Sequence, residues 1–145
     1  MKKIINILFL IIFAVSILGC NNSDTYSYKV NVEAKKYYDK AKKEYKKSQF
    51  KRAIITLTKA IRLDPKNAKL YTKRGDCYRK IRKAQKAIKD YDIAIKYNKS
   101  SARAYYHRGT LKIILGKKDD GCLDVKKSKS LAYIPANNYY KEHCE

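Results

Sequence analysis

The sequence has few of the residues that break helices and few acidic residues to balance its basic ones. It contains two prolines and five glycines in 145 residues, enough chain for one domain. This composition favours a helical chain over an all-β fold with many turns. Only 13 Asp and Glu residues face 35 Lys and Arg residues, so the formal charge is +22. Such an excess indicates an anionic partner, although codon usage biased toward Lys gives the same excess.

Catalytic and metal-binding motifs are also missing. The sequence has no glycine-rich phosphate loop, no G-x-S-x-G elbow and no H-E-x-x-H motif. No two cysteines have C-x-x-C spacing, and His107 and His143 do not complete a metal-ligand set. The adjacent Asp119 and Asp120 fall at a predicted helix start, where acids stabilise the positive end of the helix dipole. We therefore expect no enzyme activity, no cofactor and no metal site.

What the sequence does have is an internal period of 34 residues. Shifting the sequence against itself by this period aligns columns of similar residues: Ala34, Ala68 and Ala102; Tyr37, Tyr71 and Tyr105; Lys40, Arg74 and Arg108; Ala41, Gly75 and Gly109; Ala53, Ala87 and Gly121; Leu57, Tyr91 and Val125; Ala60, Ala94 and Ser128. These columns are what two packed antiparallel helices in each repeat require.

Within each repeat the spacing predicts which residues share a helix face. Tyr71 and Gly75 are four residues apart on the first helix, where the glycine allows a neighbouring helix to approach, and we expect it to meet Ala87. Ala87, Tyr91 and Ala94 form one apolar stripe on the second helix. Stop and start signals agree: Asp64-Pro65 ends one helix, and Asn67 and Ser101 are candidate N-caps.

The repeat resembles the tetratricopeptide repeat, and the second copy matches best, with Tyr71, Gly75, Tyr78, Ala87, Tyr91 and Ala94. The resemblance covers residues 34 to about 131; an ordinary helical bundle is the alternative. It implies an all-α fold, a right-handed α-α superhelical solenoid of about three helix hairpins. The helices are expected at 34–47, 50–63, 68–81, 84–97, 102–115 and 118–131, within a solenoid spanning 34–145. A short helix from Ala136 to Cys144 would cap the last repeat, because an uncapped repeat exposes its inner side.

In tetratricopeptide proteins the first helix of each repeat lines a concave groove that takes peptide segments. By that resemblance the groove residues here are Lys35, Tyr38, Lys42, Tyr45, Lys69, Thr72, Asp76, Arg79, Lys80, Arg103, Tyr106 and Thr110. Basic groups beside tyrosine rings bind carboxylates and stack on planar side chains, unless these are simply solvated lysines. Some family members grip a C-terminal carboxylate with a Lys and an Asn one turn apart. Tyr38 and Lys42 hold those places, so we expect no binding of chaperone tails.

The first twenty residues have the pattern of a targeting signal. Lys2 and Lys3 precede an apolar run from Ile4 to Leu18 that is too short to span a bilayer comfortably. The run ends in Leu18-Gly19-Cys20, which resembles the lipobox of bacterial lipoproteins, in which Cys20 would be lipidated after removal of residues 1–19. An ordinary secretory signal or an uncleaved anchor is the alternative. The polar residues that follow indicate a flexible tether over 20–33.

By the same resemblance, Asn21 after the cysteine favours the outer membrane, so we expect a lipid-anchored protein on the extracytoplasmic side of the cell envelope. The C-terminal stretch from Asp120 to Cys144 resembles a degenerate terminal repeat of bacterial tetratricopeptide proteins. In those proteins the two cysteines are close, which predicts a disulfide between Cys122 and Cys144. Closing that loop of about 23 residues stabilises the fold by about 3 kcal/mol. Cys77 falls on an inward face, as a small core residue.

Two functional hypotheses follow. In the first, the protein is a membrane-anchored interaction module whose groove binds an extended or acidic segment of another protein. In the second, its basic surface binds polyanions such as glycosaminoglycan, extracellular nucleic acid or acidic envelope polymers. Binding of polyanions should weaken steeply with salt, because it is driven by counterion release. An intracellular role on nucleic acid conflicts with the export signal.

Overall fold

The computed structural model describes the backbone of residues 22–145 and the side chains from residue 30 onward. The signal sequence expected over residues 1–19 and the lipidation site at Cys20 therefore lie outside the described residues. The described part of the chain forms seven helices and no strand. They are α2 (Asn22–Lys46), α3 (Phe50–Leu63), α4 (Ala68–Lys80), α5 (Ala84–Tyr97), α6 (Ala102–Ile114), α7 (Lys118–Ser130) and α8 (Ile134–His143).

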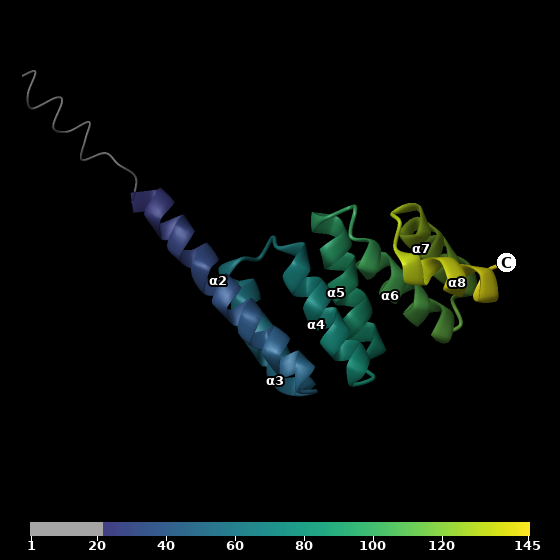
Figure 1. The fold of residues 1–145 in the computed structure, drawn as a ribbon, viewed down its shortest axis with the longest axis horizontal. Coiled ribbons are helices and arrows are strands. Elements are labelled where there is room, and N and C mark those ends of the chain that lie inside the picture. Colours follow the sequence, from purple (N-terminus) through teal and green to yellow (C-terminus); the bar gives the residue numbers. More distant parts are fainter. Residues whose placement is uncertain (1–21) are drawn as a thin grey trace, which may run out of the picture.

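The helices pack as consecutive antiparallel hairpins, α2 with α3, α4 with α5 and α6 with α7. Figure 1 shows the hairpins stacked in chain order, with α8 packed at the C-terminal end of the stack. Each hairpin contacts the next through neighbouring helices, α3 with α4 and α5 with α6. The predicted all-α solenoid of three hairpins with a C-terminal cap is confirmed.

Most helix boundaries lie within a residue of those predicted. The helices over 50–63 and 84–97 match, and α4, α6 and α7 each end one residue early. The helix ends before Asp64-Pro65 as predicted, and the Asn67 side chain caps α4 by accepting a hydrogen bond from the Lys69 amide at 3.1 Å. Ser101 precedes α6, but its side chain makes no capping bond. The capping helix begins at Ile134 rather than Ala136, because Pro135 is tolerated in the first turn, where its missing N–H needs no partner.

The prediction of a flexible tether over 20–33 is wrong for the described residues of that range. Helix α2 begins at Asn22, 12 residues before the predicted start at Ala34. No proline or glycine lies between Asn22 and Lys46, so nothing interrupts the helical hydrogen bonds. Figure 1 shows this part of α2 extending beyond its partner α3. No helix within residues 22–145 combines the length and apolar content needed to cross a bilayer.

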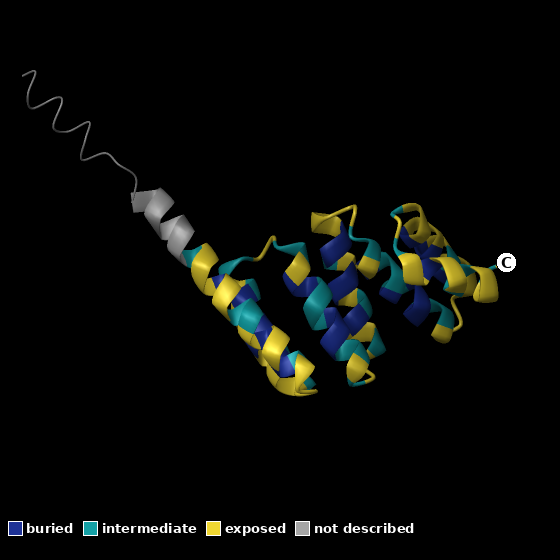
Figure 2. Ribbon diagram, in the orientation of Figure 1, coloured by how far each residue is buried: buried dark blue, intermediate teal, exposed yellow. Residues whose placement is uncertain are grey.

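The core lies between the two helices of each hairpin and between neighbouring hairpins, as the dark blue segments of Figure 2 show. Tyr91 and Ala87 on α5 are fully buried, and Tyr71 packs with them. The close approach predicted at Gly75 is confirmed, since a Cβ there would lie 2.7 Å from Cε1 of Tyr91. The ring that Gly75 meets belongs to Tyr91, however, and not to the expected Ala87. Cys77 is completely buried, and burial raises its thiol pKa to about 12.

The turn inside each hairpin reverses the chain through one residue in the left-handed region. Ser48, Arg82 and Gly116 occupy this place at φ values of 58°, 60° and 80°, and they are spaced 34 residues apart. Only the third is a glycine, the residue that adopts this conformation without steric penalty. The turn before α8 uses the same device at Ala132, φ 59°. The repeat therefore sets the turn geometry even where the sequence lacks glycine.

Candidate functional site: the concave groove

The first helices of the three repeats enclose two adjoining hollows. The first, of about 370 Å³, is bounded by α2, α4, α6 and the loop before α6; the second, of about 380 Å³, lies between α2 and the start of α4. Tyr38 and Lys69 line both hollows, so the two form one groove along the inner helices. Half of the twelve expected groove residues line these hollows: Lys35, Tyr38, Lys69, Thr72, Asp76 and Arg103.

The groove is basic because its deepest acid is already neutralised. Asp76 is 1% exposed, and its Oδ2 accepts hydrogen bonds from Nε and Nη2 of Arg103 at 3.0 and 2.9 Å. Its Oδ1 accepts a hydrogen bond from the hydroxyl of Tyr91 at 2.9 Å, and burial raises the pKa of that phenol. Asp76 was expected to bind ligand. The structure assigns it another task, because both of its oxygens hold groups of the chain itself.

A buried histidine lies beside this ion pair. Nε2 of His107 is 3.7 Å from Oδ1 of Asp76, beyond hydrogen-bonding distance, and has no other partner among the described residues. Burial lowers the pKa of His107 to about 4, even though Asp76 opposes the shift. The ring is therefore neutral at pH 7, and it packs 5.9 Å from the ring of Tyr91 and 5.1 Å from that of Tyr106.

The other expected groove residues lie in three different settings. Lys42 lies at the rim, where it pairs with Asp39 at 2.8 Å and is exposed. Lys80 is exposed in the last turn of α4. The prediction for Thr110 is wrong, since this residue is buried and its hydroxyl donates to the carbonyl of His107 at 3.0 Å. Its place on the helix points between α6 and its neighbours and not toward solvent, a difference that spacing alone does not resolve.

Tyrosines line the far end of the concave face. Tyr45 of α2 packs against Phe50 with ring centroids 5.2 Å apart, and Nζ of Lys73 lies 4.4 Å from its ring. Tyr106 of α6 is partly covered by α8, because its ring lies 5.3 Å from that of Tyr133 and 5.7 Å from that of Tyr139. The groove is thus open beside α2 and α4 and partly closed by the cap at α6.

Lys73 is the groove residue that the sequence analysis missed. It lines the first hollow beside Lys69, one turn earlier on α4. The signal was available, because residues four apart share a helix face. Lys69, Lys73 and Arg103 therefore present three cations around one hollow, with only the engaged carboxylate of Asp76 among them.

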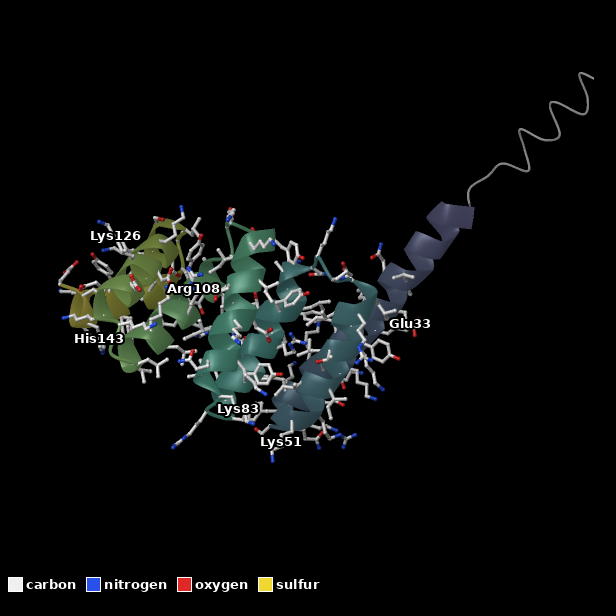
Figure 3. The ribbon with its side chains drawn as sticks, turned by 180° about the vertical axis from the view of Figure 1, so that it is seen from behind. Glu33, Lys51, Lys83, Arg108, Lys126 and His143 are labelled. Atoms are coloured by element: carbon white, nitrogen blue, oxygen red, sulfur yellow. A yellow bond between two sulfur atoms is a disulfide. The ribbon has the colours of Figure 1, made fainter. Side chains whose placement is uncertain are left out.

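The basic column of the repeat has a structural role. Arg74 donates from Nε and Nη2 to Asp90 at 2.8 and 2.7 Å, and Arg108 makes the equivalent two bonds to Asp124. Each pair joins the two helices of one hairpin. Figure 3 places Arg108 among the helices, whereas Lys51 and Lys83 lie at the edge formed by the hairpin turns. Asp90 and Asp124 are 34 residues apart, a column that would have revealed the pairing.

The C-terminal cap is fixed by a covalent bond. A disulfide joins Cys122 on α7 to Cys144 directly after α8, the pair named from the sequence. Ala136 of α8 is fully buried, so this helix covers the apolar side that the last hairpin would otherwise expose.

Comparisons with known proteins agree with this architecture. A tetratricopeptide repeat family model matches residues 56–89. The TPR repeat-containing thioredoxin TDX of Arabidopsis thaliana is 34% identical over 101 residues, which is 70% of this chain and 27% of that protein. The chain spans about a quarter of the length of the curated relatives that it matches first.

Two of the similar solved structures are domains of Spaghetti (RPAP3) bound to the HSP90 peptide SRMEEVD. The first domain superposes with a TM-score of 0.74 at 27% identity, covering 77% of this chain and 90% of that one. The second gives 0.68 at 32% identity, covering 70% and 94%. Since a third of the residues agree over nearly the whole of that second domain, and the 34-residue hairpins stack in the same way, this chain belongs to the tetratricopeptide repeat family.

Proposed function

We propose that this chain is a protein–protein interaction module whose concave groove binds an extended acidic segment of another protein. The observation that carries the proposal is the charge of the first hollow. Lys69, Lys73 and Arg103 surround it, and Asp76, which also lines it, is already bound by Arg103. A segment with acidic side chains supplies the missing counter-charge, and Tyr38 and Thr72 add hydrogen-bonding groups along its path.

The similar structures support the chemistry of this ligand. Both Spaghetti domains are bound to a peptide, SRMEEVD, that contains three acidic residues. Our proposal for this chain concerns acidic side chains within the segment. The places where other family members grip a terminal carboxylate hold Tyr38 and Lys42, and Lys42 is paired with Asp39.

We further propose that the module is held at a membrane of the bacterial cell envelope, on its extracytoplasmic side, by lipid on Cys20. This proposal rests on the lipobox-like sequence that ends at Cys20. In such a protein the helical start of α2 changes how the module stands at the membrane. The 12 residues from Asn22 to Ala34 are helical, so they would hold the first repeat about 18 Å from the anchor.

The groove is tested by fluorescence anisotropy with a labelled, C-terminally amidated SRMEEVD peptide, and with SRMQQVN as its neutral match. We expect saturable 1:1 binding of the acidic peptide that persists at high salt. The double variant Lys69→Gln, Lys73→Gln should bind at least tenfold more weakly. The matched control is Lys51→Gln, Lys59→Gln, which removes the same charge from the exposed face of α3.

Equal weakening by both double variants, together with loss of all binding at high salt, would contradict the groove proposal. That result would instead favour the polyanion hypothesis, in which total charge decides affinity.

A further inference from the structure

One arginine of the concave face has no carboxylate partner. Three of the arginines on α4 and α6 pair with an aspartate: Arg74 with Asp90, Arg103 with Asp76, and Arg108 with Asp124 and Asp92. Arg79, the fourth, forms no ion pair with any described residue, and its Nε is buried without a hydrogen-bond partner. A buried donor left without an acceptor is unfavourable, so this nitrogen favours a ligand that supplies one.

The surroundings place Arg79 in the middle of the concave face. Its positive charge opposes the burial-driven rise in the pKa of Tyr45 on α2 and of Tyr106 on α6. It also acts on His107, whose pKa is lowered first by burial and then by nearby cations including Arg79. Arg79 on α4 is therefore flanked by tyrosines from the inner helices of both neighbouring repeats.

A second unpartnered nitrogen lies in the same cluster. Nε2 of His107 is buried without a hydrogen-bond partner, like Nε of Arg79. The acids nearby do not supply the missing acceptors. Asp76 is held by Arg103 and Tyr91, and Glu142 on α8 is exposed, with His143 as its nearest basic group at 3.9 Å. The cluster thus has donors to spare, and the phenol hydroxyls of Tyr45 and Tyr106 add two more.

The spacing along α4 relates this cluster to the first hollow. Arg79 follows Lys73 by six residues and Lys69 by ten, which corresponds to about 9 and 15 Å along the helix axis. An extended peptide advances about 3.3 Å per residue. A segment that lies along the groove would therefore reach from the lysines to Arg79 in about three to five residues.

We propose that Arg79, between Tyr45 and Tyr106, is a second anion subsite of the groove, and that it binds a side-chain carboxylate three to five residues from the acid held by Lys69 and Lys73. This inference rests on the proposed function and specifies its ligand: a segment with two acidic positions at a defined separation, in place of any acidic run. The guanidinium would bind the carboxylate through two parallel hydrogen bonds, with the tyrosine hydroxyls donating to its free lone pairs.

The test uses the full chain and a series of labelled peptides, acetylated and amidated at their ends. Each peptide carries two aspartates in a Gly-Ser-Ala background, separated by one to seven positions, and a peptide with one aspartate completes the series. In anisotropy titrations the wild-type protein should bind best at a separation of about three to five. Arg79→Gln should lose about tenfold on those peptides and leave the single-aspartate peptide unchanged.

Two further variants keep the test decisive. Arg62→Gln, which removes the same charge from the exposed face of α3, should leave the whole series unchanged. Tyr45→Phe with Tyr106→Phe keeps the rings in place and should weaken only the preferred separation, should Arg79→Gln fail to fold.

The outcomes separate this inference from the proposed function. If the wild-type protein binds acidic peptides with equal affinity at every separation, or if Arg79→Gln behaves like Arg62→Gln, the second subsite is refuted and the proposed function stands. If the wild-type protein binds none of the peptides, the proposed function fails with it.

Discussion

Replacing Asp76 by Asn should weaken the fold and strengthen binding, two effects of opposite sign from one buried charge. The asparagine keeps an oxygen that accepts from the Tyr91 hydroxyl, but it loses the charge that holds Arg103. Arg103 is 45% exposed while Asp76 is 1% exposed, so water replaces only part of the interaction. Exchanging a charge-assisted bond for a neutral one here should lower the free energy of unfolding by about 1–2 kcal/mol. That is less than the loss on breaking a fully buried pair.

The same substitution removes the negative charge closest to the bound acidic segment. A carboxylate bound about 8 Å from the position of Asp76 is repelled by about 1 kcal/mol at an effective dielectric constant of about 40. The guanidinium of Arg103 is also freed to turn toward the ligand. Asp76→Asn should therefore bind amidated SRMEEVD about fivefold more tightly or better.

Urea denaturation followed by circular dichroism measures the first effect, and anisotropy titration measures the second. Asp92→Asn is the matched control, because Asp92 is exposed and pairs with Arg108 away from the groove. It should change neither quantity by more than a few tenths of a kcal/mol. If Asp76→Asn weakens peptide binding, then Asp76 serves to orient Arg103 toward the ligand, and the explanation by charge neutralisation is refuted.

Three further predictions concern the stability of the fold. His107 has a pKa of about 4 in the folded protein and about 6.5 when unfolded, so the unfolded chain binds the proton first and stability should fall by about 3 kcal/mol as the pH drops from 6.5 to 4. Urea midpoints across this range should show the fall, and His107→Gln should flatten it. Reducing the Cys122–Cys144 disulfide should lower stability by about 3 kcal/mol and make α8 sensitive to limited proteolysis, whereas an unchanged digestion pattern would show that packing alone holds the cap. Arg82→Gly should raise the thermal midpoint by relieving the left-handed turn at φ 60°, by about 0.5–1 kcal/mol in free energy, and Gly116→Arg should lower it by a similar amount; a loss in both variants would contradict the turn explanation.

The sequence alone determined the helices because their signals are local. A period of 34 residues, the stop at Asp64-Pro65 and the cap at Asn67 act through a few neighbouring backbone groups, so α3 to α7 begin and end within a residue of prediction. The groove face also followed from spacing, since residues three and four apart share one side of a helix. The start of α2 was missed because polar composition suggested a tether, although nothing in that stretch breaks a helix.

Only the tertiary structure decided what each side chain meets across the helix interfaces. Spacing placed Asp76 and Thr110 on the groove side, but packing buried both and gave Asp76 to Arg103, a residue 27 positions away on another helix. The same packing left Arg79 without an acid and set it between tyrosines of two other repeats. The sequence of one helix fixes which residues share its faces, and the charge state and partners of those residues depend on the helices packed against them.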